Sequence, residues 1–69
     1  MTPKEFLEKF PIGTTIQSID SKEIFQVVDF LSYNVFVQVI KTRSIHYIPG
    51  QLMLLPPTLF NSFKKINKA

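Results

Sequence analysis

The chain contains no cysteine, and this absence removes the commonest reinforcements of a short protein. Disulfide bonds are excluded, and a structural zinc site needs four nitrogen or sulfur ligands where this sequence offers a single histidine. A domain of 69 residues buries only about 60% of the surface of its unfolded chain, so its stability margin is small. An efficient hydrophobic core or a partner subunit must supply the reinforcement.

Acidic residues are missing from the second half of the sequence. Asp29 is the last Asp or Glu, and residues 1–29 carry a formal charge balance of −2. Residues 30–69 carry +5, from Lys41, Arg43, Lys64, Lys65 and Lys68. This asymmetry favours a negatively charged partner, with nucleic acid as the first candidate. The alternative interpretation is that these bases only keep the protein soluble and complement a helix dipole.

Catalytic, metal-binding and cofactor-binding motifs are missing as well. His46 is the only histidine, and the neighbouring hydroxyls of Ser44 and Tyr47 form no known nucleophile–base arrangement. Gly13 and Gly50 are isolated turn residues and do not form a phosphate-binding loop. The absence of tryptophan disfavours an aromatic cage or a groove for proline-rich peptides. We therefore expect a protein that is not an enzyme and that binds no metal, cofactor or small-molecule substrate.

The sequence also lacks long apolar runs. No segment approaches the roughly 18 unbroken apolar residues that indicate a membrane span. The first residues, Met-Thr-Pro-Lys-Glu, include an acid and lead into no apolar stretch of the kind found in secretory signals. We expect a cytoplasmic protein without a membrane partner.

The residues that are present predict a short helix near the start of the chain, over residues 2–10. Thr2 is suited to the N-cap position, a proline follows at the first helical position, and Glu5 completes a capping box with Thr2. Pro11 ends the helix, because the residue before a proline is disfavoured in helical angles. Residues 14–19, which are rich in Thr and Ile, are predicted to form a first strand.

The strongest pattern is a hairpin formed by residues 23–29 and 34–41. Three valines occupy one face of the second arm. The other face of that arm carries Phe36, Gln38 and Ile40, and this face is either covered by one of the helices or exposed. The first arm alternates imperfectly, which predicts a β-bulge near Val27–Val28. The turn is predicted at residues 32–34, where the asparagine tolerates left-handed backbone angles.

The remaining sequence predicts two further strands and a second helix. Residues 44–48 alternate as a strand with Ile45 and Tyr47 on one face. Residues 51–55 fit either a final strand or a single helical turn. Residues 58–65 are predicted to form a helix capped by their first threonine, with basic residues at its C-terminal end.

These elements predict one small α+β domain that covers residues 1–69. Four or five short strands joined by tight turns form an antiparallel sheet, flanked by short N- and C-terminal helices. A half-open barrel of the Src-homology-3 or Sm type is the commonest way to close so few strands. The predicted core consists of Phe6, Leu7, Phe10, Ile16, Phe25, Val27, Val35, Val37, Val39, Ile45, Leu54, Phe63 and Ile66.

The first functional hypothesis is a small, non-catalytic protein that binds nucleic acid or associates with it. Lysine and arginine side chains would contact phosphates, and aromatic rings would stack on the nucleobases or hydrogen-bond to them. The candidate phosphate contacts are Lys41, Arg43, Lys64 and Lys65, and the candidate rings are Tyr33, His46 and Tyr47.

The second hypothesis is a protein-interaction module. It would be a homodimeric regulator, or a small inhibitor from a mobile element. The inhibitor would dock on a larger enzyme through Phe36 and Ile40 or through the acidic N-terminal surface. The spatial arrangement discriminates between the two hypotheses. Bases that converge on one face with exposed aromatics between them favour nucleic acid. Scattered bases beside a contiguous, exposed apolar strand face favour a protein partner.

Overall fold

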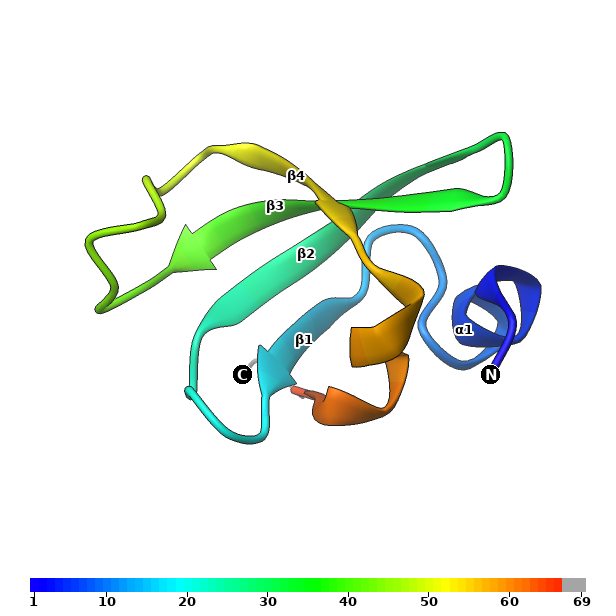
Figure 1. The fold of residues 1–69 in the computed structure, drawn as a ribbon, viewed down its shortest axis with the longest axis horizontal. Coiled ribbons are helices and arrows are strands. Elements are labelled where there is room, and N and C mark those ends of the chain that lie inside the picture. Colours follow the sequence, from blue (N-terminus) through cyan, green and yellow to red (C-terminus); the bar gives the residue numbers. More distant parts are fainter. Residues whose placement is uncertain (67–69) are drawn as a thin grey trace.

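A computed structural model describes residues 1–66 as a five-stranded antiparallel sheet with short helices (Figure 1). In chain order the elements are α1 (Pro3–Lys9), β1 (Thr15–Ser18), β2 (Ile24–Leu31), β3 (Asn34–Lys41), β4 (Leu52–Leu55), the 3-10 helix η1 (Pro57–Ser62) and β5 (Phe63–Lys65). The strand order is β4-β3-β2-β1-β5. Within residues 1–66, β4 and β5 each pair with one neighbour, so the sheet is not closed into a barrel. No helix in these residues is long and apolar enough to cross a membrane.

Helix α1 begins and ends as its sequence predicts. The Thr2 hydroxyl oxygen accepts a hydrogen bond from the Glu5 amide at 3.1 Å, and Glu5 Oε1 accepts one from the Thr2 amide at 2.7 Å. Phe10 is the C-cap residue, directly before Pro11. The helix presents Phe6 and Phe10 to the sheet, with their ring centroids 4.9 Å apart and both side chains buried.

The β2–β3 hairpin confirms the predicted alternation and the predicted bulge. The three valines of β3 are buried, and the pairing shifts between Val27 and Asp29, which leaves Val28 as the extra residue. The turn differs from the prediction in one detail. Ser32 and Tyr33 hold the left-handed angles, with φ of 52° and 62°, and the asparagine instead begins β3. Positive φ at both central residues is the requirement of a tight type I′ hairpin turn.

The predicted strand at residues 44–48 is wrong, because this segment is a loop. Its short polar side chains bond the backbone locally: Thr42 Oγ1 accepts from the Ser44 amide at 2.9 Å, and Ser44 Oγ accepts from the His46 amide at 3.0 Å. Such bonds occupy amides that a strand ladder would need. Ile45, a predicted core residue, is therefore 94% exposed.

The predicted helix at residues 58–65 is also wrong, and η1 followed by β5 replaces it. Ser18 pairs with Phe63, and the next two residues of β5 continue the pairing with β1. This pairing satisfies backbone groups along an edge of β1 that a helix would leave open. Phe60 on η1 is 1% exposed and its ring lies 4.7 Å from that of Phe6. Lys68, the base that follows the predicted helix, lies outside the described residues.

The core lies between the sheet and the two helical elements, which pack against each other on the same side (Figure 1). Its buried members are Phe6, Phe10, Ile16, Phe25, Val27, Val35, Val37, Val39, Leu55, Phe60 and Phe63. Leu7 and Ile66 of the predicted core are only partly buried. Leu54, also predicted inside, pairs with Phe36 on the opposite face and is 50% exposed, whereas Leu55 pairs with Val35 and is buried.

Candidate interaction surface on the outer face of the sheet

No element within residues 1–66 covers the side of the sheet that faces away from the helices. Because side chains alternate along a strand, every buried residue of β1 to β4 places its neighbours on this opposite side. We call it the outer face. It consists of Thr15, Gln17, Ile24, Gln26, Val28, Asp29, Leu31, Phe36, Gln38, Ile40, Lys41, Leu52, Leu54, Lys64 and Ile66.

The outer face is unusually apolar for a surface without a cover. Eight of its fifteen residues are aliphatic or aromatic, and only three are charged. Leu31 is 63% exposed, Leu52 is 66% exposed and Ile40 is 43% exposed. Antiparallel sheets with one solvated face normally carry polar residues there. Exposed apolar residues gathered on an uncovered sheet face make it a candidate interaction surface.

Two shallow hollows interrupt the outer face. The first is lined by Thr15, Ile24, Gln26, Ile40, Lys41 and Ile66. The second is lined by Val28, Asp29, Leu31, Phe36 and Leu52. Three of the six residues that line the first hollow and four of the five that line the second are aliphatic or aromatic, and one charged residue lines each hollow.

A glutamine pair separates the two hollows. Gln26 and Gln38 are directly opposed in the β2–β3 register, at the middle of the outer face. Gln26 Nε2 donates to the Gly13 carbonyl at 3.3 Å, and Gln38 Nε2 donates to the Gly50 carbonyl at 3.2 Å. Because these Nε2 groups already donate to protein carbonyls, covering them costs less than burying donors without a partner.

Charge is distributed unevenly along the outer face. Lys41 pairs with Ile24 at one end, and Lys64 pairs with Gln17, the β1 residue that also faces Ile24. The two lysines therefore belong to the same transverse row. Asp29 pairs with Phe36 toward the other end, and its Oδ1 accepts a hydrogen bond from the following amide at 2.8 Å. The face has a basic end and an acidic end.

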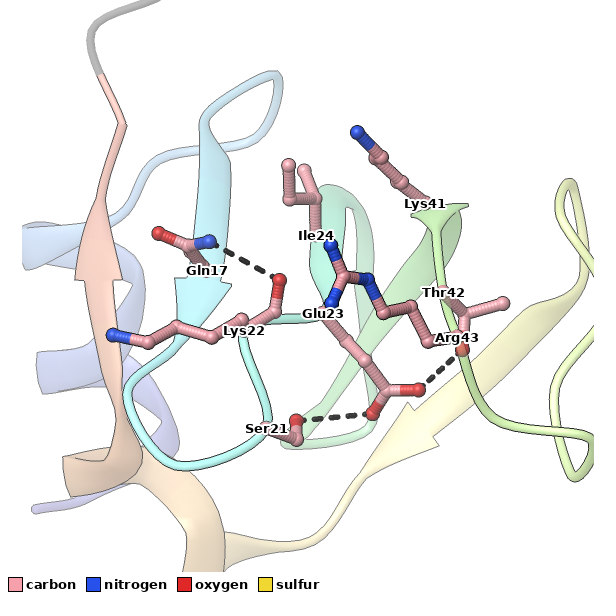
Figure 2. A pocket seen from close by; sticks show the side chains of 8 residues that line it. All are labelled: Gln17, Ser21, Lys22, Glu23, Ile24, Lys41, Thr42 and Arg43. Atoms are coloured by element: carbon pink, nitrogen blue, oxygen red, sulfur yellow. Dashed lines mark hydrogen bonds between the residues drawn. The ribbon is translucent and has the colours of Figure 1, made fainter.

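A polar hollow adjoins the basic end (Figure 2). Glu23 is 9% exposed there, and its carboxylate accepts hydrogen bonds from Ser21 Oγ at 3.1 Å and from Thr42 Oγ1. The three bases that line the hollow are Lys22, Lys41 and Arg43. Figure 2 shows the Lys22 ammonium directed away from the other two, so the bases do not converge on one point.

The predicted nucleic-acid site is dispersed by the fold. Lys41 and Arg43 lie at one end of β3, whereas Tyr33, 73% exposed, lies in the hairpin turn at the other end. These ends are about 25 Å apart, at roughly 3.4 Å per residue of strand. Lys65 pairs with the core residue of β1, so it lies on the opposite side of the sheet from Lys64.

The predicted aromatic residues of that site are dispersed as well. Tyr47 is partly buried and packs edge-on against Phe25, with ring centroids 6.2 Å apart. His46 is exposed in the loop between β3 and β4.

The predicted interface residues, in contrast, are brought together. Phe36 and Ile40 both lie on the outer face, on the same strand. Sequence reasoning missed the contribution of β4, because every residue of Leu52–Leu55 is apolar and the pattern does not show which ones face outward. The register with β3 settles this, since Leu52 pairs with Gln38 and Leu54 with Phe36.

Residues 1–66 contain no group of three or more side chains placed to hold a metal ion. The comparisons with known proteins name no relative: no protein-family model, no curated protein and no solved structure matches this chain.

Proposed function

We propose that this protein is a non-catalytic protein-interaction module that docks through its outer face. The observation that carries the proposal is the row of apolar side chains on a sheet face that no part of residues 1–66 covers. The face joins Phe36 and Ile40 to Leu31, Leu52 and Leu54.

The energetics support a docking role. Full burial of a Leu or Phe side chain is worth about 1.5–3 kcal/mol, so completing the burial of a half-exposed leucine adds roughly 1 kcal/mol. Leu52 and Leu54 each offer a gain of this size. A charge at either position would remove the gain and place an unpaired ion in the contact.

Site-specific photo-cross-linking in the cells that make the protein tests the proposal. A photoreactive phenylalanine analogue replaces Leu54, and in a second variant it replaces Phe36. The control positions are Glu8 on α1 and Thr58 on η1, both exposed on the other side of the molecule. We expect cross-linked products from the outer-face positions alone, and their loss when Ile40→Asp is added. Equal products from the control positions, or none from the outer face, would refute the proposal.

Association with nucleic acid is a second candidate function. Its support is the row that places Lys41 and Lys64 at the same end of the outer face, with Arg43 beside it. A salt titration of oligonucleotide binding tests it. We expect micromolar affinity near physiological salt, and a log–log slope of about −0.9 for each duplex phosphate neutralised. Lys41→Glu with Arg43→Glu should abolish binding, whereas absence of binding at low salt would eliminate this candidate.

The half-open barrel of the Src-homology-3 or Sm type is likewise a proposal about architecture. Its support is a four-strand meander whose fifth strand returns to pair with the first, preceded by a single 3-10 helix. Small barrels of this kind host many unrelated functions, so the architecture does not select between the two candidates.

A further inference from the structure

The occupant of the outer face can be inferred from how its charges are arranged. We infer that it is a second copy of this chain, packed face to face with its strands running in the reversed direction. The inference rests on the proposed function, because it names the partner that the same surface takes. Its basis is the position of Lys41 and Asp29 relative to the Gln26–Gln38 pair.

Symmetry restricts how two copies can share this face. Homodimers are most often related by a two-fold axis, which brings the same surface patch of both copies together. For two sheets packed face to face, the axis lies between them and runs either along the strands or across them. An axis along the strands places each end of the face opposite the same end of the partner. An axis across the strands places each end opposite the other end.

The charges favour the axis across the strands. Five successive residue pairs connect β2 and β3, from Ile24–Lys41 to Asp29–Phe36, and Gln26–Gln38 is the middle pair. An axis over this middle pair carries the Lys41 row of one copy onto the Asp29 row of the other. The alternative axis would oppose lysines to lysines, and juxtaposed like charges disfavour a complex.

The apolar features fit the same arrangement. The reversal places Phe36 of each copy opposite the end of β3 that carries Ile40 in the other copy. The first hollow, which Ile24 and Ile40 help to line, therefore faces an aromatic side chain that can enter it. Leu52 pairs with Gln38 and so lies next to the axis, where it meets its own counterpart. The central glutamines meet with their Nε2 groups already bonded to loop carbonyls.

The size of the face sets the expected affinity. Standard stable interfaces use about 20–30 residues per partner, and the outer face provides fifteen. A small face with good complementarity gives a weak dimer, so we expect a dissociation constant in the micromolar range.

Analytical ultracentrifugation of the whole chain tests the inference. The protein is examined from about 1 μM to about 500 μM, a range that spans weak association. Lys41→Asp and Asp29→Lys are measured singly and combined. Both side chains are exposed, and circular dichroism checks that each variant keeps its fold. Lys65→Asp, on the opposite side of the sheet, is the matched control for Lys41→Asp.

The expected result is a concentration-dependent dimer that each single reversal weakens by about tenfold, because the symmetry repeats every lost contact. The combined variant exchanges the two charges and should return to within about threefold of the original affinity. Lys65→Asp should leave the affinity unchanged.

Two outcomes would overturn the inference. One is a monomer at every concentration, and the other is a dimer whose affinity the combined variant does not restore. Neither outcome decides the proposed function, which the cross-linking experiment tests separately. Cross-linked products from Leu54 at masses other than twice the monomer would support docking through the outer face on a different partner. Absence of cross-linked products would refute both the docking function and the dimer.

Discussion

Leu59 and Phe60 distinguish the 3-10 helix of the structure from the continuous helix that the sequence predicts for residues 58–65. The two arrangements bury different members of this neighbouring pair. In the structure, Phe60 is 1% exposed and stacks on Phe6, whereas Leu59 is 42% exposed. In the helix that the sequence predicts, Leu59 would face the core together with Phe63. Substitutions at these two neighbouring positions therefore measure which arrangement forms.

The expected losses in the free energy of unfolding follow from how deeply each side chain is buried. Phe60→Ala should cost about 3–5 kcal/mol. A 69-residue domain is stable by roughly 3–10 kcal/mol, so that variant would be largely unfolded. Phe60→Leu keeps most of the apolar volume and loses the ring contact with Phe6, which gives a measurable cost of about 1–2 kcal/mol. Leu59→Ala removes a side chain that is already substantially hydrated, and should cost about 0.5–1 kcal/mol.

Urea unfolding followed by circular dichroism provides the assay. With a denaturant slope of about 1 kcal/mol per molar urea, Phe60→Leu should lower the midpoint by about 1–2 M. Leu59→Ala should lower it by about half as much or less. If Leu59→Ala proved as costly as Phe60→Leu, the 3-10 helix and the position of β5 would both be wrong. A change in the denaturant slope of either variant would indicate an altered denatured state. The midpoints are therefore compared only between proteins with the same denaturant slope.

Three further predictions concern capping, the buried carboxylate and the hairpin turn. The capping hydrogen bonds from Thr2 lower the pKa of Glu5 below its usual 4.5. A group with a depressed folded pKa stabilises above its unfolded pKa and loses this contribution as pH falls through the folded value. The difference in melting temperature between the wild type and Glu5→Gln should therefore shrink below pH 4.5, and a constant difference would contradict the assignment. Thr42→Val removes a hydrogen-bond donor to the buried Glu23 carboxylate, and should lower the free energy of unfolding in urea by about 1–3 kcal/mol. An unchanged free energy of unfolding would show that solvent replaces the hydroxyl. Ser32→Asn places a residue that tolerates positive φ in the turn and should raise stability by up to about 1 kcal/mol, whereas a loss would contradict the type I′ geometry.

Local chemistry was sufficient for the first helix and the central hairpin. A capping box needs only residues three apart, so Thr2 and Glu5 could be recognised from spacing alone. The alternation of β3 has a period of two that no helix shares, and it identified the valine face and placed Phe36 and Ile40 on the opposite face. The bulge near Val28 was visible as a break in the same period.

Pairing between distant segments decided the C-terminal part of the fold. Residues 58–65 have helical spacing, yet Phe63 pairs with Ser18 because the edge of β1 offers backbone partners that only the folded sheet creates. Segment 44–48 alternates like a strand, yet hydroxyls in the loop occupy its amides. In β4 every residue is apolar, and only the register with β3 determines that Leu55 is buried and Leu54 exposed.

Composition and local spacing established the charge asymmetry, the absence of cysteine, the first helix and the central hairpin. They did not determine which side chains share a surface, because residues far apart in the chain become neighbours only through strand order and register. The length of β3 separates Tyr33 from Lys41, and the pairing of β5 with β1 puts Lys64 and Lys65 on opposite sides of the sheet. Strand order and register assembled the outer face from five strands, adding residues of β4 and β5 to the Phe36 and Ile40 face that the alternation of β3 had indicated.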